Sequence, residues 1–465
     1  MLAPVPAPRV IPVARRAIRE ALARSGSKLV VLDDDPTGTQ TVHGVRVCMD
    51  WSEATLRAAL ARPDLLFFIS TNSRSMSRSE AVALAHELGR GLRAAAELVG
   101  TRVVVASRSD STLRGHYPAE VDAIASELPL PPDGVILVPA FFDAGRYTIG
   151  NIHWVDTGGR LVPAHETESA RDPDFGYAHG DLREWVEEKT GGAVPAGAVT
   201  CISLEDIRLG GPDRVREILG PARGGIPIIA NAACDEDLDV LALGVLSAEQ
   251  DGKVFLYRTS ASFVKVRGGV DDRPLLTRSE SGPGPGPGLV VAGSWVARTT
   301  EQVERLAASG DVVPVEVSVP LLVSDRTRGQ ETARAANAAS KALGRGTGAL
   351  VYTTRARLDA ADFLGAGRAI MTGLCAVVAG IRHQPGFLVA KGGITSIALA
   401  RSALGCTEAE VLGQILKGIP VWRLGAGSRW SDVPYVVFPG NVGDGGALRE
   451  VFDILSGPRR RPDSV

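Results

Sequence analysis

Short apolar runs alternate with polar loops and helical stretches along the first half of the chain. A run rich in β-branched residues is typical of a strand that is buried on both faces. Four such runs each lead into a polar loop, and they cover residues 29–32, 65–69, 102–106 and 134–138. Apolar residues recur at helical spacing near 14–24, 53–61 and 79–98. This repetition predicts a parallel sheet covered by helices.

The periodicity is lost between residues 140 and 179. A segment of that length is too long for an idle connection, so we expect it to fold over a site. The alternation of strands and helices then resumes, with strands expected at 199–202, 226–230 and 254–257.

Alternating glycine and proline at residues 281–288 mark the clearest boundary. Such a segment cannot join a helix or a central strand, so we expect an exposed linker between domains 1–280 and 289–465. Downstream strands are expected at 289–292, 312–319, 349–354, 386–390 and 435–438, with helices near 299–308, 330–343, 359–380 and 445–455. The predicted fold class is α/β, with two mainly parallel sheets flanked by helices. Ligand sites are expected at the strand carboxyl ends, in the cleft between the domains.

Three adjacent aspartates, Asp33, Asp34 and Asp35, follow the first strand. Thr37 and Gly38 add a hydroxyl and a flexible turn. Adjacent like charges repel one another, so a folded chain needs a reason to hold them together. We interpret the loop as a site that holds a metal ion or positions a substrate hydroxyl; a solvated acidic turn is the alternative.

Three arginines, Arg74, Arg108 and Arg114, stand in expected strand-end loops. A guanidinium there is suited to bidentate capture of a carboxylate, although most exposed arginines have no such role. The loop that carries Arg114 also holds Asp110, Ser111 and Thr112. Candidate acid–base groups are His43, His116 and His153, which do not show a metal-ligand spacing.

Glycine-rich turns follow three strands of the second half. Residues 391–396 read Lys-Gly-Gly-Ile-Thr-Ser between a strand and a helix, and similar loops stand at 292–294 and 439–446. Free N–H groups at such a junction suit phosphate, and glycine lets the backbone approach the anion. The three loops together indicate a nucleotide cradle, with tight packing as the alternative. The sequence at 365–370 lacks the last glycine of a dinucleotide fingerprint and is expected within a helix.

Composition narrows the classes of partner. A net charge of −2 gives no sign of a nucleic-acid surface, and five widely spaced cysteines argue against a disulfide framework or a zinc site. The chain has no apolar stretch of 18 residues and no signal-peptide pattern, so we expect a cytoplasmic protein without a membrane partner. It is a possible homo-oligomer.

Taken in order, the motifs resemble those of the four-carbon acid sugar kinases, two-domain ATP-dependent enzymes that act on threonate, erythronate and 3-oxo-tetronate. The resemblance covers nearly the whole chain, and its most specific element is Asp-Ser-Thr-Leu-Arg-Gly at 110–115. The other matching motifs lie at 34–38, 145–146, 172–173, 293–294, 392–393 and 439–443.

The resemblance implies a set of site residues. It places the sugar acid against Asp34, Arg74 and the loop formed by Asp110, Ser111, Thr112, Leu113 and Arg114. It places ATP against Ser294, Gly392, Gly393, Ile394, Thr395 and Gly440. The chain departs from the usual pattern at Asp33, at His116 and at Lys391, which indicates a divergent branch.

The predicted function is Mg²⁺- and ATP-dependent phosphorylation of a hydroxyl on a short sugar acid. Arg74 and Arg114 are expected to grip the substrate carboxylate, and Asp34 or Asp35 to orient or deprotonate the hydroxyl. The glycine loops and Mg²⁺, whose protein ligands the sequence does not identify, would neutralise the transferring phosphoryl group, and domain closure would exclude water. The alternatives are a nicotinamide-dependent oxidoreductase of sugar acids and a non-catalytic sugar-acid-binding protein.

Overall fold

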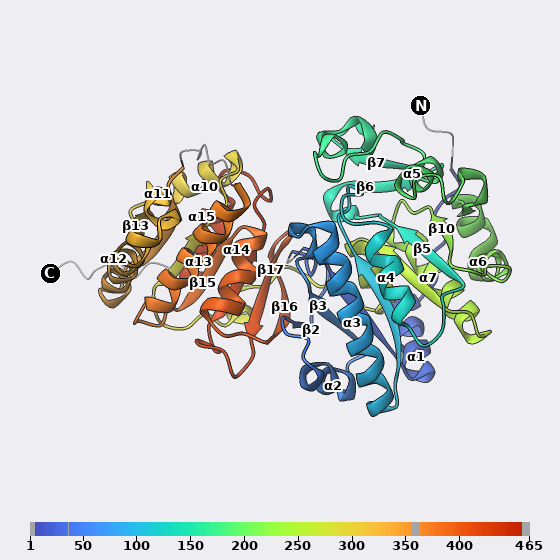
Figure 1. Cartoon of the computed structure of the whole chain (residues 1–465), viewed down its shortest axis with the longest axis horizontal. Coiled ribbons are helices and arrows are strands. Elements are labelled where there is room, and N and C mark those ends of the chain that lie inside the picture. The colour runs from blue at the N-terminus through green and yellow to red at the C-terminus, as the bar shows by residue number, and fades with distance from the viewer. Residues whose placement is uncertain (1–4, 36, 356–362, 458–465) are drawn as a thin grey trace. The chain divides into compact units, whose positions relative to one another are not determined.

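The computed structural model of the chain describes residues 5–35, 37–355 and 363–457 (Figure 1). Contacts divide the chain into an N-terminal unit, Met1–Asp272, and a C-terminal unit, Arg273–Val465. Pro36 of the acidic loop and the start of the helix expected at 359–380 lie outside the described residues.

The N-terminal unit is built on a parallel sheet with the strand order β2-β3-β1-β4-β11-β5-β10-β9. Every residue of its central strand β1 is buried, as the unbroken apolar run predicts. The strands are β1 (Ser27–Asp33), β2 (Val45–Cys48), β3 (Leu66–Ser70), β4 (Arg102–Arg108), β5 (Gly134–Val138), β9 (Thr200–Ile202), β10 (Ile226–Ala230) and β11 (Phe255–Thr259).

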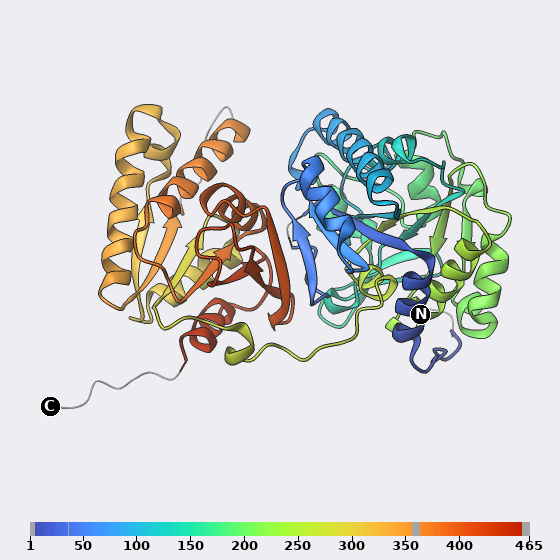
Figure 2. The ribbon, with the colours of Figure 1, turned by 90° about the horizontal axis from the view of Figure 1, so that it is seen from below.

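Helices cover both faces of this sheet (Figure 2). One group is α2 (Glu53–Ala61), α3 (Arg78–Val99) and α4 (Ala119–Glu127), and the other is α1 (Ala14–Ser25), α6 (Gly211–Leu219), α7 (Asp235–Gln250) and α8 (Ala261–Arg267). The expected N-cap of α2 is confirmed, because the Ser52 hydroxyl accepts a hydrogen bond from the Thr55 N–H.

The segment without periodicity forms a small antiparallel sheet of its own. It contains β6 (Arg146–Ile149), β7 (Ile152–Asp156) and β8 (Leu161–Pro163), followed by α5 (Leu182–Lys189). Short strands with partly exposed side chains do not produce the continuous apolar runs of the main sheet, which explains why the sequence did not reveal them.

The C-terminal unit has a mixed sheet with the order β13-β14-β12-β15-β18-β17-β16. It is parallel through β18, and β17 and β16 then pair antiparallel. The five expected strands are β12 (Gly288–Ala292), β13 (Val312–Val317), β14 (Gly348–Thr353), β15 (Phe387–Lys391) and β18 (Pro434–Phe438). The hairpin of β16 (Glu408–Leu416) and β17 (Ile419–Leu424) was not expected, and its ladder is interrupted by two register shifts, one of them beside Gly413.

The helices of this unit are α9 (Arg278–Ser281), α10 (Ala297–Ala307), α11 (Val319–Val323), α12 (Asp325–Gly344), α13 (Phe363–Gly380), α14 (Gly393–Ala398) and α15 (Ala447–Ser456). The incomplete dinucleotide fingerprint lies inside α13, as expected.

The glycine–proline segment 281–288, expected as the linker between domains, lies a few residues after the division that the contacts of the chain give. The division falls between Asp272 and Arg273, and the segment packs within the C-terminal unit. Gly284 N–H donates to the Gly386 carbonyl at 2.8 Å, and Gly386 N–H donates to the Pro287 carbonyl at 2.9 Å. Glycine allows this approach of two backbones, because a Cβ on Gly386 would overlap the backbone of the segment.

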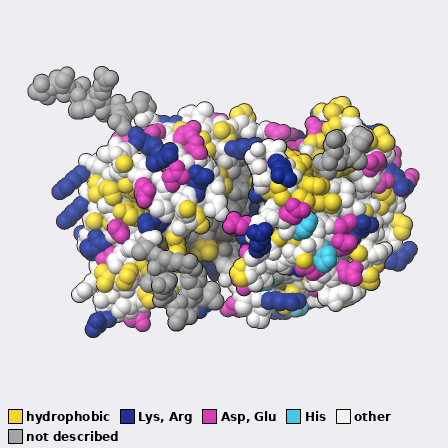
Figure 3. All heavy atoms as spheres, turned by 90° about the horizontal axis from the view of Figure 1, so that it is seen from above, with side chains coloured by type: hydrophobic (Ala, Val, Ile, Leu, Met, Phe, Trp, Pro, Cys, Tyr) yellow, Lys and Arg dark blue, Asp and Glu magenta, His cyan; other side chains and the backbone are white. Residues whose placement is uncertain are grey.

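Charged side chains of both signs are interspersed on the face shown in Figure 3, in keeping with a net charge of −2. Within the described ranges, no helix combines the length and the apolar character that crossing a membrane requires.

Candidate functional site

The strand order brings the polar loops of the N-terminal unit to one edge of its sheet. β1 lies between β3 and β4, and Asp33 at its end is in register with Ser70 and Arg108. Asp34 N–H donates to the Arg108 carbonyl at 3.1 Å. The acidic loop, the loop after β3 and the 110–114 loop therefore meet where parallel sheets bind ligands.

Arg74 is the centre of this cluster. Its guanidinium lies 2.6 Å from Asp34 Oδ1, 3.3 Å from Asp35 Oδ2 and 3.4 Å from Asp110 Oδ1. Burial alone would raise the pKa of Asp35 and of Asp110. Arg74 lowers both values, helped by Arg108 and Thr37 at Asp35 and by Arg114 and Thr112 at Asp110, and together these partners outweigh burial. The three adjacent aspartates are therefore not a solvated turn.

Asp33 has different surroundings from its two neighbours. Its Oδ1 lies 3.2 Å from Arg108 Nη1, and both side chains are buried. Burial, together with the charges of Asp34 and Asp35, outweighs Arg108 and raises the pKa of Asp33 to about 8. Gly38 closes the loop over this carboxyl, because a Cβ at that position would overlap the Asp33 oxygens.

Two residues of these loops have left-handed backbone conformations that non-glycine residues rarely adopt. Asn72 has φ of 54° and Leu113 has φ of 71°. Such conformations cost about 1–3 kcal/mol each and cluster at functional sites. Within the 110–114 loop, Arg114 Nε lies 2.9 Å from Asp110 Oδ2. Arg114 Nη1 also lies 3.5 Å from Asp172 Oδ2, outside the loop.

The small antiparallel sheet and the residues after it pack on the 110–114 loop, as expected for the segment without periodicity. His153 Nε2 lies 2.7 Å from the Ser111 carbonyl, and the Tyr177 hydroxyl donates to the Thr112 carbonyl at 2.8 Å. Burial lowers the pKa of His153 to about 4, so its ring is neutral near pH 7 and donates through Nε2.

The three candidate acid–base histidines share this kind of contact. His43 Nε2 lies 3.0 Å from the Asp271 carbonyl, and His116 Nε2 lies 3.2 Å from the Ser73 carbonyl. All three rings are thus placed to support the backbone of loops rather than to face an open site.

Two further arginines lie in this region; sequence reasoning missed Arg258 and gave Arg146 only as part of the motif at 145–146. Arg258 lies in β11 and is buried, and its Nη2 donates to the Arg114 carbonyl at 2.9 Å. Arg146 begins β6, and its charge acts on Asp110 and Arg114. An arginine inside the apolar run 255–259 is the signal that could have identified Arg258.

The C-terminal unit brings its three glycine loops together in the same way. β15 lies between β12 and β18, and their last residues, Ala292, Lys391 and Phe438, are in register. The loops that carry Ser294, Gly392 and Gly440 therefore leave the sheet side by side.

Close approaches between these loops explain their glycines. Gly392 has φ of 115°, and a Cβ there would lie 3.0 Å from Thr395 Oγ1. A Cβ on Gly440 would lie 3.2 Å from Ser294 Oγ, and Thr299 Oγ1 donates to the Gly440 carbonyl at 3.1 Å. Gly393 begins α14, whereas the Ile394 side chain is 52% exposed. The structure thus brings the three glycine loops together, and their role as a nucleotide cradle stays a prediction.

Lys391 anchors this cradle from inside the unit. Its side chain is fully buried, and Nζ donates to the carbonyls of Pro439 at 2.6 Å and Gly440 at 3.2 Å. Nζ also lies 3.9 Å from the centre of the Phe438 ring. Burial, with a smaller contribution from Arg298, lowers the pKa of Lys391 to about 7.

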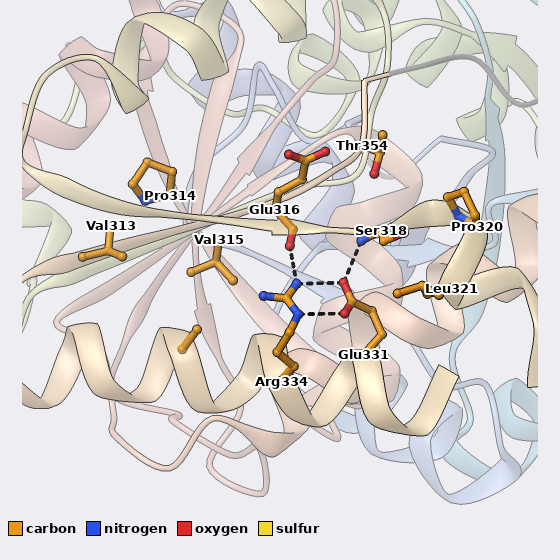
Figure 4. Close-up of a pocket in the computed structure, with 11 residues that line it drawn as sticks. Val313, Pro314, Val315, Glu316, Ser318, Pro320, Leu321, Glu331, Arg334 and Thr354 are labelled. Carbon is orange, nitrogen blue, oxygen red and sulfur yellow. Dashed lines mark hydrogen bonds and ion pairs between the residues drawn. The ribbon is translucent and has the colours of Figure 1, made fainter. Parts of the chain in front are cut away.

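A cavity of about 630 Å³ lies elsewhere in this unit, beside β13 and α12 (Figure 4). Two of its charged groups are already paired with each other: Glu331 binds Arg334 at 2.7 Å and also accepts from Ser318 N–H at 2.7 Å. Among the described residues, no group of three or more histidine, cysteine or acidic side chains is placed to hold a metal ion.

Comparisons with known proteins assign a different domain family to each half of the chain. The sugar-binding N-terminal domain family matches residues 29–267, and the nucleotide-binding C-terminal domain family matches residues 289–448. The D-threonate kinase of Salmonella typhimurium is 27% identical over 368 residues, which cover 77% of each chain.

Two solved structures share the fold. A Haemophilus influenzae protein aligns with a TM-score of 0.62 at 18% identity, covering 91% of this chain and all of its own. A Salmonella typhimurium LT2 protein aligns with a TM-score of 0.67 at 18% identity, covering 91% of this chain and 98% of its own. The chain belongs to the family that its sequence resembles, the four-carbon acid sugar kinases, phosphotransferases that join a sugar-binding N-terminal domain to a nucleotide-binding C-terminal domain.

Proposed function

We propose that this protein uses ATP to phosphorylate a hydroxyl of a four-carbon sugar acid of the threonate, erythronate or 3-oxo-tetronate type. The observation that carries the proposal is the cluster of Asp34, Asp35 and Asp110 around Arg74 at the carboxyl edge of the sugar-binding sheet. Carboxylates held in fixed positions are suited to accept hydrogen bonds from the hydroxyls of such an acid. Ser111, Thr112 and the backbone of Leu113 and Arg114 complete the proposed substrate site.

The two candidate bases differ in accessibility. The Asp34 side chain is 4% exposed and receives two hydrogen bonds from Arg74, whereas Asp35 is 27% exposed and lies 3.3 Å from one arm of Arg74. We assign Asp35 as the group that orients the hydroxyl and takes its proton, and Asp34 as the group that positions Arg74. The hydroxyl oxygen then bonds to the γ-phosphorus as the bond to the ADP oxygen breaks.

Ser294, the turn from Gly392 to Thr395 and Gly440 form the proposed nucleotide site. Loops whose missing Cβ atoms leave room for close backbone approach suit the phosphates of ATP. Mg²⁺ bound with ATP would neutralise charge on the transferring group, and it commonly takes only one or two protein carboxylates. Among the described residues, no group of three or more acidic, histidine or cysteine side chains identifies protein ligands for this ion.

An oxidoreductase is less well supported. The incomplete fingerprint at 365–367 lies within α13 rather than in a turn before a helix, which removes its resemblance to a dinucleotide loop.

The proposal is tested by ADP release from Mg²⁺-ATP with a panel of threonates, erythronates and their oxo forms. We expect turnover that depends on the acid and falls at least 100-fold in Arg114→Ala, because Asp110 loses the shorter of its two ion pairs. Arg216→Ala is the control, since that arginine forms an exposed ion pair with Asp251 elsewhere in the unit. Binding of acid and ATP without any turnover would overturn the kinase proposal in favour of a non-catalytic binding protein.

A further inference from the structure

Arginines near the aspartate cluster differ in whether an acid neutralises them. Arg74 and Arg114 each form at least one ion pair with an aspartate, and Arg108 donates to the buried Asp33 at 3.2 Å. Arg258 is buried beneath the loop and donates to a backbone carbonyl. Arg258 and Arg146 form no ion pair with any residue that the structure describes. Unlike Arg258, Arg146 also donates no side-chain hydrogen bond there, and its buried Nε has no partner.

The surroundings of Arg146 make this lack of a partner costly. Burial lowers the pKa of its guanidinium, Asp110 and Asp156 act in the opposite sense, and Arg114 repels it. A partly buried charge without a paired acid is unfavourable unless something else satisfies it. An anionic ligand would supply both the missing charge and an acceptor for Nε–H.

The backbone fixes Arg146 at the substrate loop. Its N–H and carbonyl both bond to Phe141, and it stands opposite Val155 of β7. β7 in turn contacts the 110–114 loop through His153, whose Nε2 lies 2.7 Å from the Ser111 carbonyl. Arg146 is thus tied to the loop that the proposed substrate contacts.

We propose that Arg146 binds the carboxylate of the sugar acid and distinguishes the acid from a neutral sugar of the same length. This inference rests on the proposed function and gives it a basis for substrate choice. The carboxylate group would be repelled by Asp34, Asp35 and Asp110, and Arg74 is already committed to these three. A guanidinium without an acid partner is therefore the group best suited to receive it.

The test compares an acid with its neutral analogue. D-threonate and threitol, which has a CH₂OH group in place of the carboxylate, are assayed with wild type, Arg146→Met and Arg146→Lys. We expect kcat/KM for threonate to fall about 10- to 100-fold in Arg146→Met, with the value for threitol changed less than about threefold. KM for ATP should not change. Arg160→Met is the control, because Arg160 is exposed in the connection between β7 and β8 of the same small sheet.

Arg146→Lys should recover part of the preference for the acid, since it keeps the charge but not the planar fork. Unchanged discrimination in Arg146→Met would overturn the proposal, and so would an equal loss with both ligands in both variants. Calorimetric binding of threonate and threitol without ATP separates this inference from the proposed function. If wild type binds threonate but never turns over, the kinase proposal fails, and loss of threonate binding in Arg146→Met still supports the role of Arg146.

Discussion

Replacing Lys391 by methionine should change how the stability of the C-terminal unit depends on pH. Methionine has similar length and no charge, so Lys391→Met removes the buried ammonium without leaving a large cavity. Pro439 loses its hydrogen-bond donor, at a cost of about 1–3 kcal/mol. Gly440 keeps the bond from Thr299, which lies 3.1 Å away.

The magnitude follows from the pKa of Lys391, which falls from 10.5 to about 7 in the folded chain. Between these values the unfolded chain binds more protons than the native one, so stability rises with pH. The rise between pH 7 and pH 9.5 is about 3 kcal/mol at 1.36 kcal/mol per pKa unit. Below pH 7 both states are protonated, and the slope disappears.

Hydrogen exchange can report the stability of the C-terminal unit separately from that of the N-terminal unit. It is measured as a function of urea, at pH 7 and pH 9.5, for peptides from β15 and β18. The free energy of unfolding of this unit should rise by about 3 kcal/mol between pH 7 and pH 9.5 in wild type, and it should not rise in Lys391→Met. Lys341→Met is the control, because Lys341 is exposed on α12 and should leave the pH slope as in wild type. Equal slopes in wild type and Lys391→Met, within about 1 kcal/mol, would refute the reasoning.

Three further predictions concern the two sites. Asp35→Asn should lower kcat about 10²- to 10⁴-fold with little change in the thermal midpoint. Asp34→Asn should lower the midpoint as well, since the charge that pairs most closely with Arg74 is lost. If instead Asp35→Asn lowers the midpoint and Asp34→Asn lowers only kcat, the two roles are exchanged. Gly392→Ala should raise KM for ATP at least tenfold, because φ is 115° and the added methyl enters the cradle. Gly346→Ala has the same backbone problem at φ of 78° with open space around it, and should leave KM unchanged. Asp33→Asn should remain active. In wild type, the folded pKa of about 8 should lower the free energy of unfolding by about 2–3 kcal/mol between pH 5 and pH 7. Urea titrations at both pH values should show that Asp33→Asn lacks this fall.

Much of the fold could be predicted because its strands are buried on both faces. The runs at 134–138 and 226–230 coincide with β5 and β10, since nothing but apolar residues fits the middle of a covered parallel sheet. The antiparallel strands were harder to predict. β16 contains Gly413 at a register shift, and β6 is short and half-exposed, so neither gives a continuous apolar signal.

Which residues form the candidate site could be predicted better than how they pair. Polar residues after buried strands pointed to Asp34, Arg74 and Asp110, yet 76 positions separate the two aspartates in the sequence. Their meeting at one guanidinium depends on the order β3-β1-β4, which strand-by-strand reasoning does not supply. The same strand order surrounds Arg74 with three aspartates, and the sequence alone could not show that a substrate carboxylate would compete with them for this arginine.

Energetic cost is found at the strand ends that carry the proposed binding loops of each unit. β1 and β15 are buried along their whole length, yet they end in Asp33 and Lys391, an acid and a base whose charged forms burial disfavours. The left-handed backbone of Leu113 adds strain at the same edge of the N-terminal sheet. Sequences that only had to fold would place apolar residues and relaxed turns at these positions. We therefore propose that ligands offset part of the cost at the binding loops. The phosphates of ATP would do so at Lys391, whereas an anionic acid would favour the neutral form of Asp33.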